Sequence, residues 1–270
     1  MKLTSEESAG VELPSFRLEG RIAVVTGASE GMGRTFAIAC AKAGAEVVVA
    51  SRRRQKLLEV VRSIRQDGGA AHAVTLDVVR PASVRALAER VAKLAADKSR
   101  PLILINNAGF AFTKPALEIT EKDWDRVLDV HAKGTFFCAQ QIGRLMIERG
   151  YGKIINLSST WSSSTDMGKS VYGLAKAAVS YMTAALANEW GPMGVRVNAI
   201  APTATLSENT IQNFQRNPAR TKRLLSRIRL GRFAQPSDML GAVLFLASAA
   251  SDFVTGHTLF VDGGWRTGGW

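Results

Sequence analysis

The stretch Thr26-Gly27-Ala28-Ser29-Glu30-Gly31-Met32-Gly33 decides the fold. It comes directly after the apolar run Ile22-Ala23-Val24-Val25 and just before a helical pattern that begins near Arg34. Glycines let such a turn be tight and let the backbone approach a pyrophosphate, while the amides and the dipole of the helix N-terminus stabilise negative charge. The stretch therefore predicts the first βα unit of a dinucleotide-binding domain.

Outward from this unit, short β-branched runs alternate with longer helical patterns. The runs are apolar at successive positions, which is typical of strands buried on both faces of a parallel sheet. Strands are expected at 22–25, 46–49, 73–76, 102–105, 154–157, 195–198 and 258–261. Helices are expected at 37–43, 84–95, 124–147, 171–190 and 239–247. The alternation predicts an α/β fold, a doubly wound Rossmann-type sheet of about seven parallel strands with helices on both faces.

The domain organisation is simple. Residues 1–19 are expected to form a polar N-terminal extension, and residues 20–270 a single dinucleotide-binding and catalytic domain. Within that domain, polar and basic residues replace the core periodicity at about 203–235. Insertions at the carboxyl edge of a doubly wound sheet usually cover the ligand, so this segment is expected to be a substrate lid.

Composition narrows the class of protein. No apolar run approaches the roughly 20 residues that cross a bilayer, so we expect a soluble cytoplasmic protein with no membrane segment. Cys40 and Cys138 lie apart in apolar helical patterns, and no metal site is expected. The net charge of +12 comes from scattered basic residues without a nucleic-acid motif. We therefore expect only weak nonspecific binding to nucleic acid.

A tyrosine and a lysine supply the candidate chemistry. Tyr172 and Lys176 are four residues apart in an expected helix, so their side chains share one face. A phenol titrates at about 10 in water, and a nearby ammonium favours the phenolate and lowers its pKa, which suits acid/base catalysis. Ser159, at the end of an expected strand, can donate to a substrate oxygen on which negative charge develops.

Four motifs occur together and in order: Gly27-x-x-x-Gly31-x-Gly33, Asn106-Asn107-Ala108-Gly109, Ser159, and Tyr172-x-x-x-Lys176. With Val261-Asp262-Gly263-Gly264 near the end, the set resembles the short-chain dehydrogenase/reductase family over about residues 20–264. The resemblance, which extends to 3-oxoacyl-acyl carrier protein reductases and gluconate-type dehydrogenases, implies hydride transfer between a nicotinamide cofactor and a carbonyl or alcohol substrate. It also implies a homotetramer, with Tyr172 as acid/base and Lys176 as a ribose ligand.

The resemblance also implies a set of cofactor-binding positions. Asp77 and Val78 would flank the adenine, and Asn107, Ala108 and Gly109 would support the central sheet. An alternative for Asp77 is simple capping of a strand end. The full expected set is Gly27, Ser29, Glu30, Gly31, Met32, Gly33, Ser51, Arg52, Arg53, Asp77, Val78, Asn107, Ala108, Gly109, Tyr172, Lys176, Pro202, Thr203, Thr205 and Ser207.

The choice of cofactor depends on the end of the second strand. Ala50-Ser51-Arg52-Arg53-Arg54 has no carboxylate there to bond a ribose 2′-hydroxyl. A guanidinium matches the geometry of a 2′-phosphate, so NADP(H) is favoured and NAD(H) remains possible. Glu30 argues the other way, because a carboxylate near a phosphate is unfavourable. A solvated helix start is the alternative for the arginines.

Two positions depart from the family pattern. His131 stands where relatives commonly have an asparagine that holds a water linking the lysine to solvent. Either His131 replaces that amide in the proton relay, where an imidazole would titrate near neutral pH, or it is a buried polar residue. Thr203 replaces a glycine, and Ser207 takes the place of a threonine that bonds the nicotinamide carboxamide.

The substrate is harder to predict. The segment 210–233 carries seven basic residues and no acidic one, which suits a solvated face, a subunit contact or attraction of an acidic substrate. Trp161, Met167 and Phe214 are candidate pocket residues. A 3-oxoacyl thioester and a sugar acid are the substrate classes to test first, and a cofactor- or ligand-sensing protein without turnover is the alternative. The basic residues are Arg216, Arg220, Lys222, Arg223, Arg227, Arg229 and Arg232.

Overall fold

The computed structural model describes residues 13–97 and 99–267, and it contains one seven-stranded parallel sheet. Most of the expected extension 1–19, and Trp270, lie outside the described residues. The strand order is β3-β2-β1-β4-β5-β6-β7, the predicted doubly wound arrangement with its switch point between β1 and β4. The strands are β1 (Ile22–Thr26), β2 (Glu46–Ser51), β3 (Ala71–Thr75), β4 (Leu102–Asn106), β5 (Gly152–Leu157), β6 (Val195–Pro202) and β7 (Thr258–Val261).

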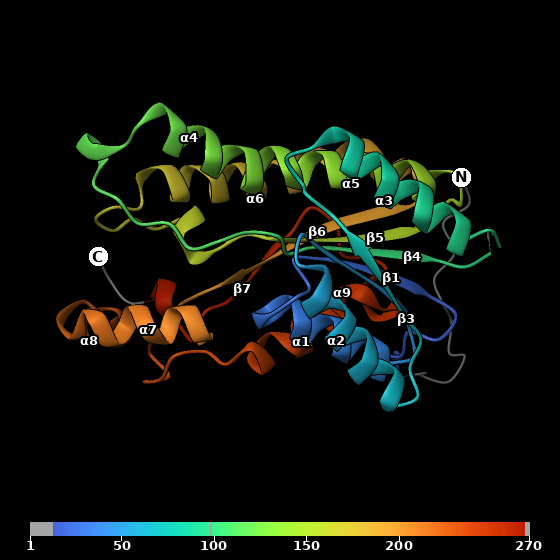
Figure 1. Ribbon diagram of the computed structural model, residues 1–270, viewed down its shortest axis with the longest axis horizontal. Coiled ribbons are helices and arrows are strands. Elements are labelled where there is room, and N and C mark those ends of the chain that lie inside the picture. The colour runs from blue at the N-terminus through green and yellow to red at the C-terminus, as the bar shows by residue number, and fades with distance from the viewer. Residues whose placement is uncertain (1–12, 98, 268–270) are drawn as a thin grey trace, which may run out of the picture.

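Helices cover both faces of the sheet (Figure 1). On one face lie α3 (Pro81–Leu94), α4 (Glu121–Leu128), α5 (Gly134–Ile147) and α6 (Ser170–Trp190); on the other lie α1 (Gly31–Lys42), α2 (Arg54–Gln66) and α9 (Leu240–Ala247). Neighbouring positions of one strand point to opposite layers: Val24 belongs to the core under α3 and α5, and Val25 to the core under α1 and α9. Burial on both faces explains the continuous apolar runs.

The carboxyl ends of the central strands are aligned by buried polar contacts. Asn106 of β4 stands opposite Asn156 of β5, and its amide donates to the Asn156 side-chain oxygen at 3.0 Å. Asn156 donates in turn to the Thr183 hydroxyl of α6 at 3.0 Å. Because buried amides are costly unless they are bonded, this chain fixes the register of β4, β5 and α6. The loops that follow these strands therefore start from one rigid edge.

Some elements differ from the sequence expectation. The expected helix 124–147 is interrupted, because residues Asp129–Lys133 form a π-helical segment between α4 and α5. Helix α2, which begins at Arg54, was missing from the expected set. The expected lid contains two helices, α7 (Glu208–Arg216) and α8 (Pro218–Arg227), which lie beyond the carboxyl ends of β6 and β7 in Figure 1. Both helices are amphipathic but short, so each has few apolar residues and gives only a weak helical periodicity in the sequence.

Two features are absent from the described residues, a membrane-spanning helix and a cluster of metal-ligating side chains. None of the helices there is long and apolar enough to span a membrane. Nor do the described histidine, cysteine, aspartate and glutamate side chains include a group of three or more that could hold a metal ion. Cys40 and Cys138 are both buried free thiols.

Candidate active site

The glycine turn between β1 and α1 forms a tight cradle. A Cβ atom on Gly33 would lie 2.4 Å from the Gly27 carbonyl oxygen, and one on Gly27 would lie 2.8 Å from the Cα of Ala108. Neither contact is sterically possible, so both positions require glycine. Gly31 has φ +54° and an open side, where a Cβ would meet only Ser207, at 4.0 Å. An exposed backbone here, facing the loop after β6, fits the expected pyrophosphate cradle.

The Asn107–Gly109 motif holds this turn. The Asn107 amide donates to the carbonyl oxygens of Thr26 and Gly27 at 3.0 and 3.2 Å. The Thr26 hydroxyl accepts from the backbone of Asn107 and Ala108, both at 3.0 Å. These bonds tie the carboxyl ends of β1 and β4 together at the switch point.

The N-terminus of α1 is available to an anion. Glu30 is its N-cap residue, yet no side chain of the described region caps it. Free N–H groups and the helix dipole together favour a phosphate at this end. The uncapped helix, the glycine cradle and its exposed backbone fit the pyrophosphate of a dinucleotide.

Basic residues at the end of β2 are already partly engaged. Arg53 pairs with Glu30 at 2.7 Å and donates to the Ser29 hydroxyl at 2.9 and 3.2 Å. Its backbone N–H donates to Ser51 at 3.2 Å. The Arg53 guanidinium lowers the pKa of the Glu30 carboxyl. Glu30 thus acts as a counter-ion to Arg53, which reconciles the acidic residue with a basic site. Arg52 is exposed and is the freer guanidinium.

The other expected adenine residues lie beyond β3. The Asp77 carboxylate accepts from the backbone N–H of Val79 at 3.3 Å, and the backbone N–H of Asp77 donates to the Ser83 hydroxyl at 3.0 Å. It therefore also performs the capping role that was the alternative. Val78 packs closely against Gly134: a Cβ atom added to Gly134 would lie only 2.9 Å from the Val78 Cβ.

Tyr172, Lys176 and Ser159 come together at the carboxyl edge. The Lys176 ammonium lies 5.8 Å from the centre of the Tyr172 ring and donates to the Leu157 carbonyl oxygen at 2.6 Å. Ser159 accepts from the Trp161 backbone N–H at 3.2 Å, which leaves its own O–H free to donate. Ser158, by contrast, binds the Lys176 carbonyl oxygen at 3.1 Å and so holds α6 in place. The geometry favours Ser159 as the reactive hydroxyl.

Burial dominates the protonation of this pair. Desolvation raises the pKa of Tyr172 to about 12, and the Ser159 hydroxyl lowers it only in part. Desolvation also lowers the pKa of Lys176 to about 7. From the sequence, the pKa of the phenol was expected to be lowered by the ammonium; it is raised instead, because burial disfavours the charged form of both groups. Lys176 therefore exchanges its proton near neutral pH.

His131 lies in the π-helical segment and faces the tyrosine. Its ring is 1% exposed and stands edge-on to Tyr172, 5.3 Å between centroids. Its Nε2 accepts from the Phe110 backbone N–H at 3.4 Å, which places the proton on Nδ1, and Nδ1 has no partner among the described residues. Burial, helped by Lys176, holds the pKa of His131 well below its usual value of 6.5. The expectation of an imidazole that titrates near neutral pH is not supported.

The loop after β6 offers one unused hydroxyl. Thr203 follows Pro202, the last residue of β6, and its buried Oγ1 has no partner among the described residues. Thr205 donates to the Thr203 carbonyl oxygen at 3.0 Å. Ser207, expected to bond the carboxamide, caps α7 by accepting from the Thr210 backbone N–H at 3.3 Å. Thr203 is therefore the freer donor for that contact.

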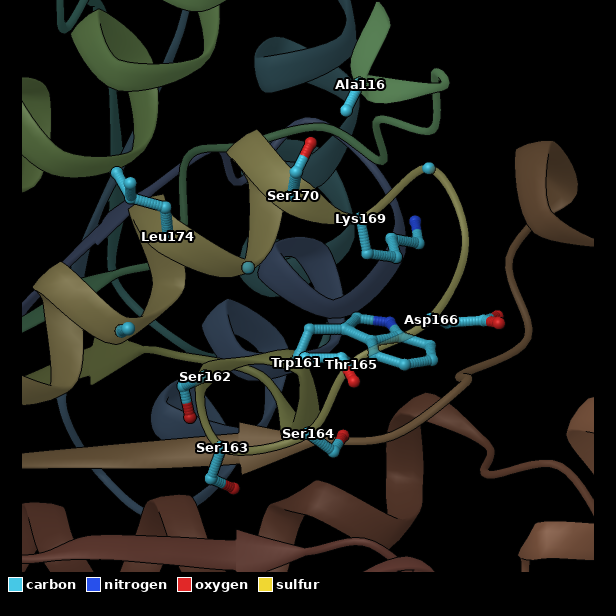
Figure 2. A pocket seen from close by; sticks show the side chains of 13 residues that line it. Ala116, Trp161, Ser162, Ser163, Ser164, Thr165, Asp166, Lys169, Ser170 and Leu174 are labelled. Atoms are coloured by element: carbon cyan, nitrogen blue, oxygen red, sulfur yellow. The ribbon is translucent and has the colours of Figure 1, made fainter. Parts of the chain in front are cut away.

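A pocket of about 460 Å³ lies along the loop after β5 and the first turns of α6 (Figure 2). Trp161 lines this pocket, whereas Met167 is exposed outside it and Phe214 stacks on Phe233 within the lid. Tyr172, Lys176 and Ser159 do not line the pocket themselves. Lys169, which the sequence did not single out, links the two places, because it lines the pocket and its ammonium lies 5.0 Å from the centre of the Tyr172 ring. One signal was present, because a cation at the start of a helix opposes the helix dipole.

Comparisons with known proteins agree with this geometry. A family model described as enoyl-(acyl carrier protein) reductase matches residues 27–266. The 2-dehydro-3-deoxy-D-gluconate 5-dehydrogenase of Dickeya dadantii is 37% identical over 254 residues, which are 94% of this chain and 98% of that protein. The D-threitol dehydrogenase of Mycolicibacterium smegmatis is 36% identical, over 97% of this chain and 99% of its own length.

A solved structure resembles the chain equally well. The gluconate 5-dehydrogenase of Burkholderia cenocepacia, crystallised with NADP and tartrate, superposes with a TM-score of 0.88 at 36% identity. The match covers 94% of this chain and 98% of that one.

Together, the dinucleotide-binding sheet and the Ser-Tyr-Lys cluster at its carboxyl edge define an NAD(P)-dependent oxidoreductase that acts on CH–OH groups. Within that class, the extent of the matches decides the family. The chain belongs to the short-chain dehydrogenase/reductase family.

Proposed function

We propose that the protein interconverts a secondary alcohol and its ketone on a small polyhydroxylated substrate, a sugar acid or a polyol, with NADP(H) preferred and NAD(H) possible. The observation that carries the proposal is the buried cluster of Tyr172, Lys176 and Ser159 at the carboxyl edge of the sheet. Lys169, whose ammonium is 5.0 Å from the centre of the Tyr172 ring, connects this cluster with the pocket. Relatives named as dehydrogenases of gluconates and threitol support it. They also argue against a cofactor sensor without turnover.

The cofactor supplies hydride transfer to or from the substrate carbon. Tyr172 handles the accompanying proton: its hydroxyl donates to the carbonyl oxygen during reduction and accepts from the alcohol during oxidation. Ser159 donates a hydrogen bond to the same oxygen as negative charge develops on it. A pKa of about 12 makes the Tyr172 hydroxyl a poor acid before the substrate is bound. Assistance by neighbouring groups is therefore essential.

Lys176 and His131 complete the proton path. With a pKa of about 7, Lys176 can carry charge toward Tyr172 or release it near neutral pH, and it would also bind the nicotinamide ribose. His131 remains neutral and presents an Nδ1–H donor in the place of the family amide. It therefore positions water for the relay without taking up charge itself.

The cofactor would lie across the switch point. Gly27, Gly31 and Gly33 admit the pyrophosphate to the backbone, with Ser29, Glu30 and Met32 between them. Arg52 and Arg53 would pair a 2′-phosphate, and the relative crystallised with NADP supports this preference. Asp77 and Val78 would border the adenine, and Thr203 would donate to the carboxamide.

The assembly and location are part of the proposal. We propose a cytoplasmic homotetramer, in which the face of α4 and α6 packs against a second copy. Large apolar side chains on this face support the contact: Trp124 is 43%, Leu174 44% and Tyr181 79% exposed. Residues 203–235, which contain α7 and α8, would act as the substrate lid.

A direct assay tests the function. The purified protein is mixed with NADP+ and with D-gluconate, D-threitol and galactitol in turn, and absorbance at 340 nm is followed. We expect reduction of NADP+ with at least one of them, and slower reduction of NAD+. Tight cofactor binding without turnover on alcohols or on a panel of ketones would favour the sensing alternative instead.

A further inference from the structure

Lys169 is a buried cation next to the catalytic tyrosine. Its side chain is 8% exposed and lies beside the Trp161 ring in the pocket wall (Figure 2). The ammonium donates to the Phe112 carbonyl oxygen and to the Thr113 hydroxyl, both at 2.7 Å. An ammonium has three N–H donors, so one remains for a ligand. Neither partner is charged, and among the described residues Lys169 forms no ion pair with a carboxylate.

One carboxylate of the pocket wall, that of Asp166, is shared with the lid. Its Oδ1 pairs with Arg223 at 2.7 Å, and its buried Oδ2 has no hydrogen-bond partner among the described residues. Its attraction raises the pKa of Lys169 less than burial and the Arg220 guanidinium lower it, and the pKa is about 8. A buried charge is costly unless it is paired. Lys169 is therefore a buried cation that Asp166 attracts without a direct ion pair, and it keeps a donor for a further anion.

Arg220 is a second cation on α8, the lid helix that contacts the pocket loop through Arg223 with Asp166 and through Arg227 over the Trp161 ring. It is half-buried on α8 and close enough to Lys169 to depress the pKa of that ammonium. Arg227, two turns further along α8, lies over the Trp265 ring at 4.2 Å, so its position is set by packing. The Arg220 guanidinium forms no ion pair and no hydrogen bond with the described residues; only the backbone N–H of Arg220 is bonded, to the Asn217 side chain. The N-terminus of the 21-residue helix α6, next to Lys169, contributes further positive potential.

We propose that Lys169 and Arg220 form a subsite that binds the carboxylate of the substrate, so that the enzyme selects hydroxy acids over neutral polyols of equal length. The inference rests on the proposed function, and it commits that function to an anionic substrate. The two cations and the free Lys169 donor match the charge and the acceptors of a carboxylate. Lys169 lies beside the Tyr172 ring, so a carboxylate held there would leave the neighbouring hydroxylated carbons near the phenol.

Binding can be measured without turnover. With NADPH already bound, an alcohol cannot react, so calorimetry with D-gluconate and with D-glucitol compares a carboxylate with a CH₂OH group on the same carbon chain. We expect gluconate to bind about 10- to 100-fold more tightly to the wild-type protein, the range of a hydrogen bond to a charged group. Equal binding of the two ligands would overturn the proposal.

Variants locate the effect. We expect Lys169→Met and Arg220→Gln each to weaken gluconate about 10-fold or more while glucitol changes less than about twofold, because only the acid loses a charged partner. Lys169→Arg should keep the preference for gluconate. Lys222→Gln removes an exposed cation from the same helix and should change neither ligand. Equal weakening of both ligands by Lys169→Met and Arg220→Gln would show a structural role only.

The controls separate this inference from the proposed function. Lys169 joins two loops, so folding of Lys169→Met is checked by circular dichroism, and Arg220→Gln decides the question if that variant does not fold. Absence of NADP+ reduction with every acid and polyol would contradict the proposed function but leave the calorimetric result intact. Turnover of gluconate and glucitol with equal kcat/KM, unchanged in both variants, would sink the subsite and leave the function standing.

Discussion

The two ends of the active site treat charge differently. At the nucleotide end, Arg53 and Lys56 are exposed and both pair with Glu30, at 2.7 and 3.3 Å. At the chemical end, Lys176 and Lys169 are buried, and neither forms an ion pair with a carboxylate of the described residues. Burial lowers their pKa values to about 7 and about 8. The cations of the first end thus have a carboxylate partner, whereas the two buried lysines of the second end have pKa values close to neutral pH.

The largest effect is expected at the chemical end. Tyr172→Phe removes the hydroxyl that exchanges a proton with substrate, so kcat/KM should fall about 10²- to 10⁴-fold. The affinity for NADPH, measured by fluorescence titration, should stay nearly constant, because the glycine turn, the arginines after β2 and Lys176 would still hold the cofactor. Tyr181→Phe, on the exposed side of the same helix, is the matched control and should leave both quantities unchanged. Retention of most activity in Tyr172→Phe would remove the tyrosine from its role.

An intermediate effect is expected at the nucleotide end. Arg52→Asp replaces the freer guanidinium at the end of β2, and the ratio of kcat/KM for NADPH over NADH should fall about 10- to 100-fold, because a charged bond to the 2′-phosphate is lost. Arg62→Asp makes the same charge change on the exposed side of α2 and should leave the ratio unaltered. If both variants shifted the ratio alike, long-range charge would explain the preference instead of a contact.

The smallest effect concerns His131 and pH. Its pKa in the folded protein lies well below 6.5, so as pH falls below about 6.5 the unfolded chain gains a proton that the folded chain does not. Stability is therefore lost toward acid pH, by at most about 1.4 kcal/mol per pH unit. His131→Asn should remove this loss in urea unfolding at pH 8 and pH 5.5, without moving the pH–rate profile.

The control for this experiment is a histidine near the surface. His257 is exposed, so His257→Asn should keep the wild-type dependence of stability on pH. If the pH–rate profile shifted in His131→Asn, the histidine would be a titrating member of the proton relay, contrary to our expectation, and the contrast between the two ends would be smaller.

The sheet was predictable because its signals are local. Val24 and Val25 belong to a run that is buried on both faces, and the glycine turn after it requires small residues for steric reasons. Strand positions were therefore correct to within a few residues. The pairing of Tyr172 with Lys176 could also be predicted from the sequence, since helical spacing alone places the two side chains on one face.

What failed depends on tertiary contacts. Periodicity predicts a continuous helix through Asp129–Lys133, and the π-helical segment there has no counterpart in the hydrophobic pattern. The raised pKa of Tyr172 follows from enclosure by distant segments, which no spacing reveals. Lys169 was overlooked for the same reason, because its neighbours Phe112 and Thr113 lie 57 and 56 residues away in the chain.

Trp265, near the end of the chain, packs against the pocket wall. Its indole N–H donates to Ser164 at 3.2 Å, its ring packs edge-on against Trp161 at 5.2 Å, and Arg227 of the lid covers it. Trp265 follows Ser164 by 101 residues. The residues of β1 to β6 and of the Tyr172 helix are therefore all synthesised before this packing partner of the pocket wall. The pocket wall cannot be fully packed until residue 265 has been added.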